Sequence, residues 1–344
     1  MQFGIFDHVD RGGGALHQFY EDRLALVEEY DRHGYHAYHV AEHHATPLGC
    51  APSPSVYLAA VAQRTKRLLF GPLVYTLPLY HPLRLLDEIC MLDQMSNGRL
   101  QLGVGRGISP FELGYFGLDP ETAQAMYIEA LDVILKGLIS TELTYEGKYY
   151  QYHNVPITLE AVQRPHPPLW YGIGRVDSVP WVARNGVSIV GNLSAAGMRP
   201  ITDRYREAWA ALGQPREMLP RMGVARHIVM ADSDKEALEI ARPAYLAWRE
   251  SFLILWLRHN SLPPNPAAIP AETFDEAERT GRAIAGTPGK VRDFVRETAR
   301  DGGLNYLLCR FAFGTMSRVD ATRSARMFAR DVMPEFVGRS AVVT

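Results

Sequence analysis

One tripeptide in this chain has the composition of a phosphate-binding turn. Gly105, Arg106 and Gly107 follow the apolar run 100–104, which predicts a strand. Glycines let the backbone come close to a ligand, and the guanidinium between them is a strong charge-assisted partner for a phosphate. An arginine in an ordinary strand-to-loop turn would have the same sequence, so the tripeptide alone leaves both interpretations open.

The run Glu42-His43-His44 has residues suited to acid–base chemistry, at the end of a second predicted strand, 35–41. Its spacing differs from the His-Glu-x-x-His pattern of zinc enzymes. Adjacent residues in an extended chain point to opposite sides, so the two histidines are not expected to chelate one ion, and we predict no metal site. We expect one histidine to act as an acid or base near neutral pH, with structural, hydrogen-bonded histidines as the alternative.

A third candidate site precedes a predicted helix that ends at residue 184. Gly174, Arg175 and Ser178 follow the predicted strand 169–173. The N-terminus of a helix offers free N–H groups and the positive end of a dipole, which favours a phosphate. Ser178 is expected either to cap this helix or to donate to a phosphate oxygen, and Arg175 would add positive charge.

The elements that must position these residues alternate along the chain. Predicted strands occupy residues 3–6, 35–41, 68–77, 100–104, 169–173, 187–190, 223–230 and 306–310. Predicted helices occupy residues 18–33, 54–64, 83–95, 120–138 and 201–212, with further helices before residue 184 and after residue 233, and a hairpin lies within 141–162. This alternation predicts a (β/α)8 TIM barrel with insertions, formed by residues 1–344 as a single domain.

A two-domain Rossmann enzyme is the structural alternative, but its glycine fingerprint is incomplete. The fingerprint is Gly-x-Gly-x-x-Gly. If Gly103 and Gly105 are its first two glycines, Ile108 occupies the position of the third. A proline-rich segment, 259–286, precedes the last predicted strand. At the catalytic end of a barrel, such an insertion is expected to be a mobile lid, with an inert surface loop as the alternative.

Composition excludes several classes of function. The 344 residues are 47% hydrophobic and carry a net charge of −2, so no basic surface is expected to bind nucleic acid. The most apolar segment, around residues 251–257, is much shorter than the ~20 residues of a membrane span. Three scattered cysteines fit no disulfide or metal pattern. Without a recognisable signal peptide, we expect a cytoplasmic enzyme that does not bind membranes.

The chain resembles the bacterial luciferase-like flavin monooxygenases, and the luciferase α subunit in particular. The matching stretches are Phe3-Gly4 with Phe6, Glu42-His43-His44, Leu77-Pro78 with His81-Pro82, Leu92-Asp-Gln-Met-Ser through Arg106-Gly107, Gly286-Thr-Pro-Gly, Leu307-Leu-Cys-Arg-Phe, and Phe328-Ala-Arg-Asp-Val-Met-Pro. Together they extend over nearly the whole chain.

This resemblance implies a barrel that binds FMN at its C-terminal face, usually as a homodimer. It places the catalytic histidine at His43, with His44 beside it, and a non-prolyl cis peptide between Leu73 and Val74, under the flavin ring. It implies that the flavin site consists of Phe6, Leu73, Val74, Arg106, Gly107, Gly174, Arg175, Ser178 and Trp248, with the phosphate against Arg106 and the loop at 174–178.

The function implied is that of a reduced-flavin monooxygenase. A separate reductase would supply FMNH2, and O2 would be activated as a flavin C4a-hydroperoxide that oxygenates a small organic substrate. The alternatives are an F420-dependent oxidoreductase on the same barrel and a non-catalytic flavin-binding subunit. Gly105 replaces the reactive cysteine of the luciferases, and Gly174-Arg175 replaces their Glu-Ser pair. Light emission therefore does not follow from the resemblance.

Overall fold

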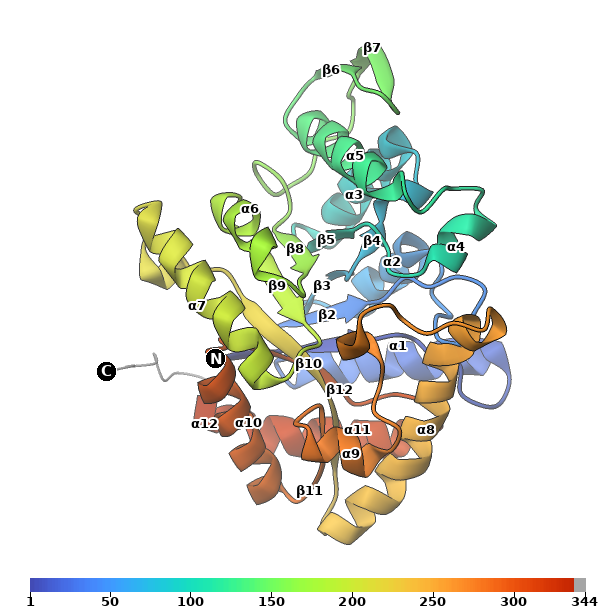
Figure 1. Cartoon of the computed structure of the whole chain (residues 1–344), viewed down its shortest axis with the longest axis vertical. Coiled ribbons are helices and arrows are strands. Elements are labelled where there is room, and N and C mark those ends of the chain that lie inside the picture. The colour runs from blue at the N-terminus through green and yellow to red at the C-terminus, as the bar shows by residue number, and fades with distance from the viewer. Residues whose placement is uncertain (337–344) are drawn as a thin grey trace.

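The strands curl into a nearly closed parallel barrel, as the alternation in the sequence predicts (Figure 1). The structure, a computed structural model, describes residues 1–336. The barrel strands, in chain order, are β1 (Gln2–Asp7), β2 (Ala37–Val40), β3 (Leu69–Pro72), β4 (Tyr75–Thr76), β5 (Leu102–Gly105), β8 (Leu169–Gly172), β9 (Ser188–Gly191), β10 (Met222–Met230) and β12 (Tyr306–Arg310).

Every neighbouring pair in this barrel is parallel. The hydrogen-bonded order is β3-β2-β1-β12-β10-β9-β8-β5-β4. Strands β3 and β4 together correspond to the single predicted strand 68–77, which the predicted cis peptide between Leu73 and Val74 interrupts. Parallel strands joined by crossovers all end at the same face, so the residues that follow each strand meet there.

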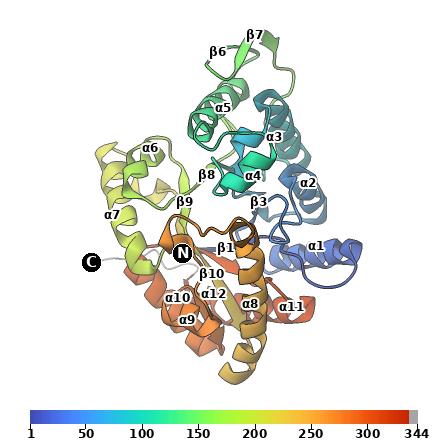
Figure 2. The ribbon, with the colours of Figure 1, turned by 45° about the vertical axis from the view of Figure 1, so that its right-hand side comes forward.

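Helices surround the barrel on its outer side (Figure 2). The longer helices are α1 (Leu16–Arg32), α2 (Pro54–Arg64), α3 (Pro82–Ser96), α5 (Ala123–Leu138), α7 (Ala195–Ala211), α8 (Asp234–Arg258), α10 (Pro288–Gly302) and α11 (Arg318–Asp331). The short ones are α4 (Pro110–Tyr115), α6 (Val179–Arg184), α9 (Phe274–Arg279), α12 (Met333–Phe336), and the 3₁₀ turns η1 (Leu77–Leu79), η2 (Val176–Ser178), η3 (Arg216–Met218) and η4 (Pro266–Ala268). No helix within residues 1–336 has both the length and the apolar character needed to cross a bilayer.

Three insertions depart from the simple alternation. The predicted hairpin is present as β6 (Glu142–Glu146) and β7 (Gln151–Pro156), and it projects away from the barrel (Figure 1). Helix α4 was not predicted. The stretch 259–286, predicted as one mobile insertion, contains α9 and a buried strand, β11 (Ala283–Gly286), which pairs with β10. The lid prediction therefore applies only to the proline-rich part before α9.

The predicted helix 120–138 begins later than its sequence indicates. Asp119-Pro120 forms a turn rather than a helix start, because the Asp119 side chain accepts from the N–H of Glu121 at 2.9 Å. The helix itself, α5, begins at Ala123 after Thr122. Helix α7 conversely begins at Ala195, earlier than the predicted residue 201, because the Ser194 side chain caps it by accepting from the N–H of Gly197.

The barrel closes where β3 passes the segment leading into β5. The N–H of Phe70 donates to the Arg99 carbonyl at 3.1 Å, and the Phe70 carbonyl accepts from Gln101 at 2.8 Å. Gly71 allows this approach, since a Cβ atom there would lie 1.8 Å from the Gln101 carbonyl oxygen. Arg99 supports the junction by donating to the Leu68, Ala62 and Thr65 carbonyls.

Four histidines lie on or beside the barrel strands, three of them buried and His36 half-buried. His39 is fully buried and neither of its ring nitrogens has a partner in the described structure. Burial, with a smaller effect of Arg221, lowers the pKa of His36 to about 4, and burial, with a smaller effect of His36, lowers that of His39 to about 3. Burial and then the charge of Arg310 lower the pKa of His8 and His227 far below the ordinary value. All four are therefore neutral at pH 7.

We expect Gly71→Ala to destabilise the protein by at least about 2 kcal/mol, because the added methyl forces β3 away from the Gln101 carbonyl. Urea unfolding followed by circular dichroism measures the change. Gly289→Ala is the matched control, since no atom lies within 4 Å of a Cβ there and helix α10 should gain slightly from alanine. Equal stability of the two variants would contradict this account of barrel closure.

We also expect the free energy of unfolding to fall as the pH is lowered from about 6.5 towards 4. The unfolded chain protonates the four histidines in this range while the folded chain does not, so protons favour unfolding. Asp10 acts in the opposite direction, since burial raises its pKa to about 6, but it is one group against four. Urea titrations at several pH values give the free energy of unfolding as a function of pH. In His39→Leu this free energy should change less steeply with pH than in the wild-type protein, by up to about 1.4 kcal/mol per pH unit. A stability that stays flat or rises on acidification would contradict the prediction.

Candidate active site

A cavity of about 660 Å³ opens at the C-terminal ends of the barrel strands. This volume lies within the ~300–1,000 Å³ range of small-molecule sites. The structure brings most of the predicted site residues together here, although they are far apart in the sequence. The predicted residues that line the cavity are Phe6, His43, Leu73, Val74, Arg106, Gly107, Gly174 and Arg175.

One wall of the cavity is apolar, and two backbone segments approach each other closely there. Leu73 and Val74, joined by the cis peptide, face Gly105 at the end of β5. A Cβ atom on Gly105 would lie 2.5 Å from a Val74 methyl group, so any side chain at residue 105, cysteine included, would displace Val74. Gly107 has φ +89°, and a Cβ atom there would lie 2.7 Å from the Thr76 methyl. Glycine is thus needed on both sides of Arg106.

The rim of the cavity has two arginines. Arg106 is exposed and makes no hydrogen bond or ion pair with any residue in the described range 1–336. Arg175 pairs with Asp177 at 2.7 Å, and both side chains are largely exposed. Both guanidinium groups can therefore reach an anionic group at the mouth without breaking a buried interaction. At both Gly172 and Gly174, the space that a Cβ atom would occupy is open.

His43 lines the cavity and is held by a carboxylate that the sequence analysis did not identify. Its Nδ1 lies 3.1 Å from Oε1 of Glu112, in helix α4. A carboxylate only accepts, so Nδ1 carries a hydrogen and Nε2 is the nitrogen able to take up or release a proton at the cavity. Ser109 caps α4 by accepting from the Glu112 N–H at 3.3 Å, and Pro110 follows it. That Ser-Pro pair is the sequence signal for this helix.

His44, the second predicted catalytic residue, does not line the cavity. Its Nε2 lies 2.9 Å from Oε1 of Glu42, and its ring packs edge-on against Phe116. The other Glu42 oxygen accepts from the N–H of Thr76, in β4. Glu42 thus links the loop after β2 to β4 and fixes His44 beside it. Within the described chain, no three His, Cys, Asp or Glu side chains gather closely enough to hold a metal ion.

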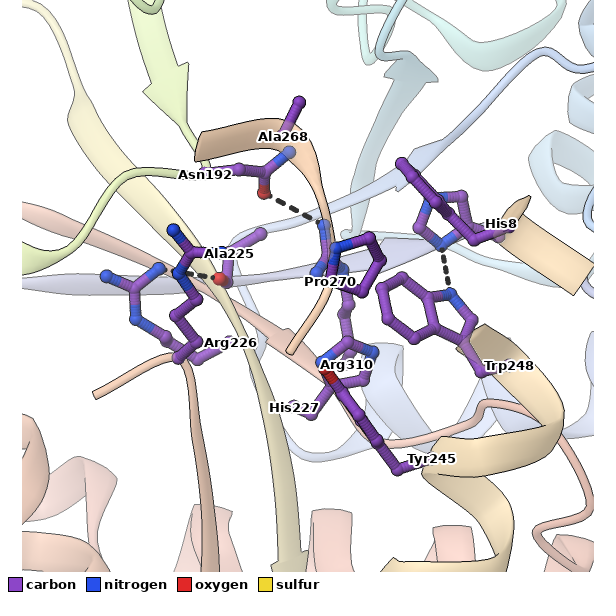
Figure 3. Close-up of a pocket in the computed structure, with 12 residues that line it drawn as sticks. His8, Asn192, Ala225, Arg226, His227, Tyr245, Trp248, Ala268, Pro270 and Arg310 are labelled. Atoms are coloured by element: carbon purple, nitrogen blue, oxygen red, sulfur yellow. Dashed lines mark hydrogen bonds between the residues drawn. The ribbon is translucent and has the colours of Figure 1, made fainter. Parts of the chain in front are cut away.

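The remaining predicted residues are separated from the larger cavity. Ser178 lines no part of it. It stands at the N-cap position of α6, but its side chain makes no capping hydrogen bond, so of the two predicted roles only the contact with a phosphate stays a prediction. Trp248, in α8, lies on the wall of a second, smaller cavity (Figure 3). There its indole N–H donates to Nδ1 of His8 at 3.3 Å. Because His8 accepts at Nδ1 and is neutral, its hydrogen is on Nε2.

Sequence reasoning also missed His8 and Arg310, which line both cavities. Both occupy the position that a barrel makes functional, at or just after the C-terminal end of a strand, β1 and β12 respectively. The same rule had selected His43 and Arg106. His8 stacks on His43 with ring centres 5.8 Å apart, so the acid–base candidate has a neutral aromatic neighbour.

Comparisons of sequence identify the family of the chain. The family model described as luciferase-like monooxygenase matches residues 1–305. An uncharacterized protein of Sinorhizobium fredii, y4wF, is 41% identical over 98% of this chain and 98% of its own. The oxygenase component of the flavin-dependent trigonelline monooxygenase of Acinetobacter baylyi is 28% identical over 69% of this chain and 67% of its own.

Comparisons of structure agree with the fold. Monooxygenase RslO1 from Streptomyces bottropensis superposes with a TM-score of 0.83 at 25% identity, over 98% of this chain and 100% of its own. The oxygenating constituent of 3,6-diketocamphane monooxygenase from Pseudomonas putida, in complex with FMN, gives 0.79 at 20% identity, over 98% and 99%. An F420-dependent tetrahydromethanopterin reductase from Methanopyrus kandleri gives 0.69 at 17%, over 97% and 99%. The predicted resemblance and the TIM barrel are confirmed, and the chain belongs to the luciferase-like monooxygenase family of flavin-dependent enzymes.

Proposed function

We propose that this enzyme binds reduced FMN from a separate reductase and uses O2 to oxygenate a small organic substrate. The observation that carries the proposal is the cavity at the barrel mouth, which combines an apolar wall with an unpaired arginine at its rim. A flavin mononucleotide has the matching parts, a flat apolar ring system and a phosphate. The bound flavin would supply the oxygen chemistry, activating O2 at its C4a carbon.

The residues present fit this cofactor. Leu73, Val74 and Phe6 offer apolar surface to the ring, and Gly105 keeps that surface free of a side chain. Arg106 would bind the phosphate, with Arg175 and the loop at 172–174 beside it. The role for Ser178 stays a prediction with no contact to support it. Trp248 would act from the neighbouring cavity rather than against the flavin.

The protein's own contribution is to manage protons and exclude water. His43 would act as the acid or base at Nε2, while Glu112 fixes its ring and tautomer from the other side. His44 would hold the loop through Glu42 and so support His43 rather than contact the flavin. The proline-rich segment before α9 provides Ala268 to the wall of the cavity, and we propose that it closes over bound substrate.

The partners follow from the chemistry and from relatives. The trigonelline relative is named as the oxygenase component of a flavin-dependent monooxygenase, which supports a separate reductase as a transient partner. Homodimer formation and a cytoplasmic location remain part of the proposal. F420 is the rival cofactor, since one structural neighbour is an F420-dependent reductase, and the binding experiment below separates the two.

We expect photoreduced FMN to bind the protein under anaerobic conditions more tightly than either reduced riboflavin or reduced F420. Arg106→Ala should weaken FMN binding about tenfold or more, because it loses a charge-assisted phosphate contact, and should not affect riboflavin, which has no phosphate. Anaerobic fluorescence titration measures the three affinities of the wild-type protein and the two of the variant. Tighter binding of F420, or equal binding of FMN by the variant, would overturn the assignment of cofactor or of Arg106. Admitting air and following the absorbance then tests whether the bound flavin reacts with O2.

We expect His43→Ala to retain FMN binding and to lower turnover of the reduced flavin about 10²-fold or more. Turnover by Glu112→Gln should lie between that of the wild-type protein and that of His43→Ala. The amide oxygen can still accept a hydrogen bond from Nδ1, but the negative charge is lost. Stopped-flow reoxidation over a range of pH measures both variants. If Glu112 only holds α4, its glutamine variant will keep the wild-type pH profile. Full activity of His43→Ala would refute its catalytic role.

A further inference from the structure

A second cavity, of about 60 Å³, adjoins the larger one, and its lining residues are drawn in Figure 3. The two cavities share six lining residues: His8, Asn192, Ala225, Phe252, Ala268 and Arg310. A molecule that enters the larger cavity can therefore extend a group into the smaller one. Because the second cavity is far smaller than the cavity of about 660 Å³, it suits a small head group rather than a flavin ring system.

Three arginines line the small cavity, and none of them is in an ion pair within residues 1–336. Arg226, fully buried, donates to the Ala225 carbonyl at 2.9 Å and the Leu193 carbonyl at 2.8 Å. Arg310 donates to the Asn192 side chain at 3.0 Å (Figure 3). Arg282 donates to the Ile269 carbonyl at 3.1 Å. All these acceptors are neutral, so nothing in the lining offsets the positive charge.

Buried polar atoms remain without partners at the same place. The Nε atoms of Arg226 and Arg310 and the Nε2 atom of His227 have no hydrogen-bond partner in the described structure. Burial, with a smaller effect of neighbouring arginines, lowers the pKa of Arg226 to about 9, and burial lowers that of Arg310 to about 10. Both guanidinium groups remain protonated at pH 7. Buried charge without a counter-charge is costly, and an anion bound in the cavity would remove that cost.

Asp10 is the carboxylate whose charge acts on Arg310, but it is engaged elsewhere. It pairs with Arg23 at 3.4 Å and accepts a hydrogen bond from the N–H of Gly314. The histidines do not supply an anion either, since His8 and His227 are neutral. The rest of the lining is aromatic, from Tyr245, Trp248 and Phe252. Positive charge beside flat apolar rings suits an organic acid rather than a free inorganic ion.

We propose that the small cavity binds the anionic head group of the substrate, a carboxylate or sulfonate, through Arg226 and Arg310. This rests on the proposed function, in which the flavin occupies the larger cavity and the substrate reaches it from the adjoining one. The flavin phosphate is the other source of an anion. It is assigned to Arg106 because that arginine is at the open rim, where a nucleotide tail can extend, and not in a cavity of 60 Å³.

The position of the head group would orient the substrate. Arg310 lies over the rings of Phe6 and Trp248, at 4.9 Å and 5.8 Å from their centres. Phe6 also lines the larger cavity, so the anion would be held directly beside the predicted flavin wall. Pro270 and Ala268, from the segment before α9, cover the small cavity, and the bond from Arg282 to Ile269 ties that cover to the start of β11.

The test uses 4-fluorobenzoate and its neutral analogue 4-fluorobenzamide as probes, with ¹⁹F relaxation measured on the flavin-free full-length protein. We expect the acid to bind at least about tenfold more tightly than the amide, because only the acid offers charge-assisted hydrogen bonds to the arginines. Arg226→Gln and Arg310→Gln should each remove this preference while leaving the amide's affinity unchanged. Arg175→Gln, which removes the same charge from the rim of the larger cavity, is the matched control and should keep the preference.

Equal affinity for the two probes, or no binding of the acid, would overturn the proposal even if the glutamine variants fail to fold, since that comparison uses only the wild-type protein. Competition separates the two sources of anion. If 4-fluorobenzoate displaces FMN but not riboflavin, the arginines bind the flavin phosphate and the proposal is wrong. Binding of the acid alongside FMN supports it. Because the probe binds without flavin, a failure of FMN binding would contradict the proposed function and not this site.

Discussion

The barrel depends on the pair of backbone hydrogen bonds by which Phe70 joins the segment 99–101. Without them, the sheet would remain open between β3 and β5, and its strand ends would not surround a common space. The close approach requires Gly71, and just beyond it the chain changes direction at Leu73 and Val74. The same junction that closes the barrel therefore builds the apolar wall of the cavity. Closure of the barrel and the wall of the proposed cofactor site are two consequences of one contact between strands.

Electrostatics divide the barrel mouth into regions with different tasks. The carboxylates Glu42 and Glu112 are each satisfied by a histidine and hold the loop and helix around His43 and His44. At the small cavity, Arg226 and Arg310 donate to neutral acceptors, and His8 and His227 are kept neutral by burial and, to a smaller extent, by the charge of Arg310. Hydrogen bonds to the two carboxylates thus hold the loop and helix near the proposed acid–base group, while the unpaired positive charge at the small cavity provides a place for the proposed anion.

Much of the fold could be predicted because long elements carry a clear hydrophobic period. Strand β12 and helix α2 have the predicted bounds, and the cis peptide followed from family resemblance. Short elements were missed. Helix α4 has six residues and β11 has four, too few for a period to emerge, and β11 was hidden in a stretch rich in proline and charge. Their consequences are not small, since α4 carries Glu112 and β11 follows Arg282.

The sequence by itself determined the alternation of strands and helices, the membership of the family and the residues that end each strand, because these depend on local periodicity and on short motifs. Only the tertiary structure decided which neighbours face the cavity. His43 lines it while His44 turns to Glu42, and Ser178 remains outside although Arg106 and Gly174 meet at the rim. The small arginine-lined cavity was likewise invisible, since Arg226 and Arg310 are 84 residues apart and become neighbours only through pairing of β10 with β12. Which charged side chains become neighbours depends on the register between two strands. The hydrophobic period of a single strand does not specify that register.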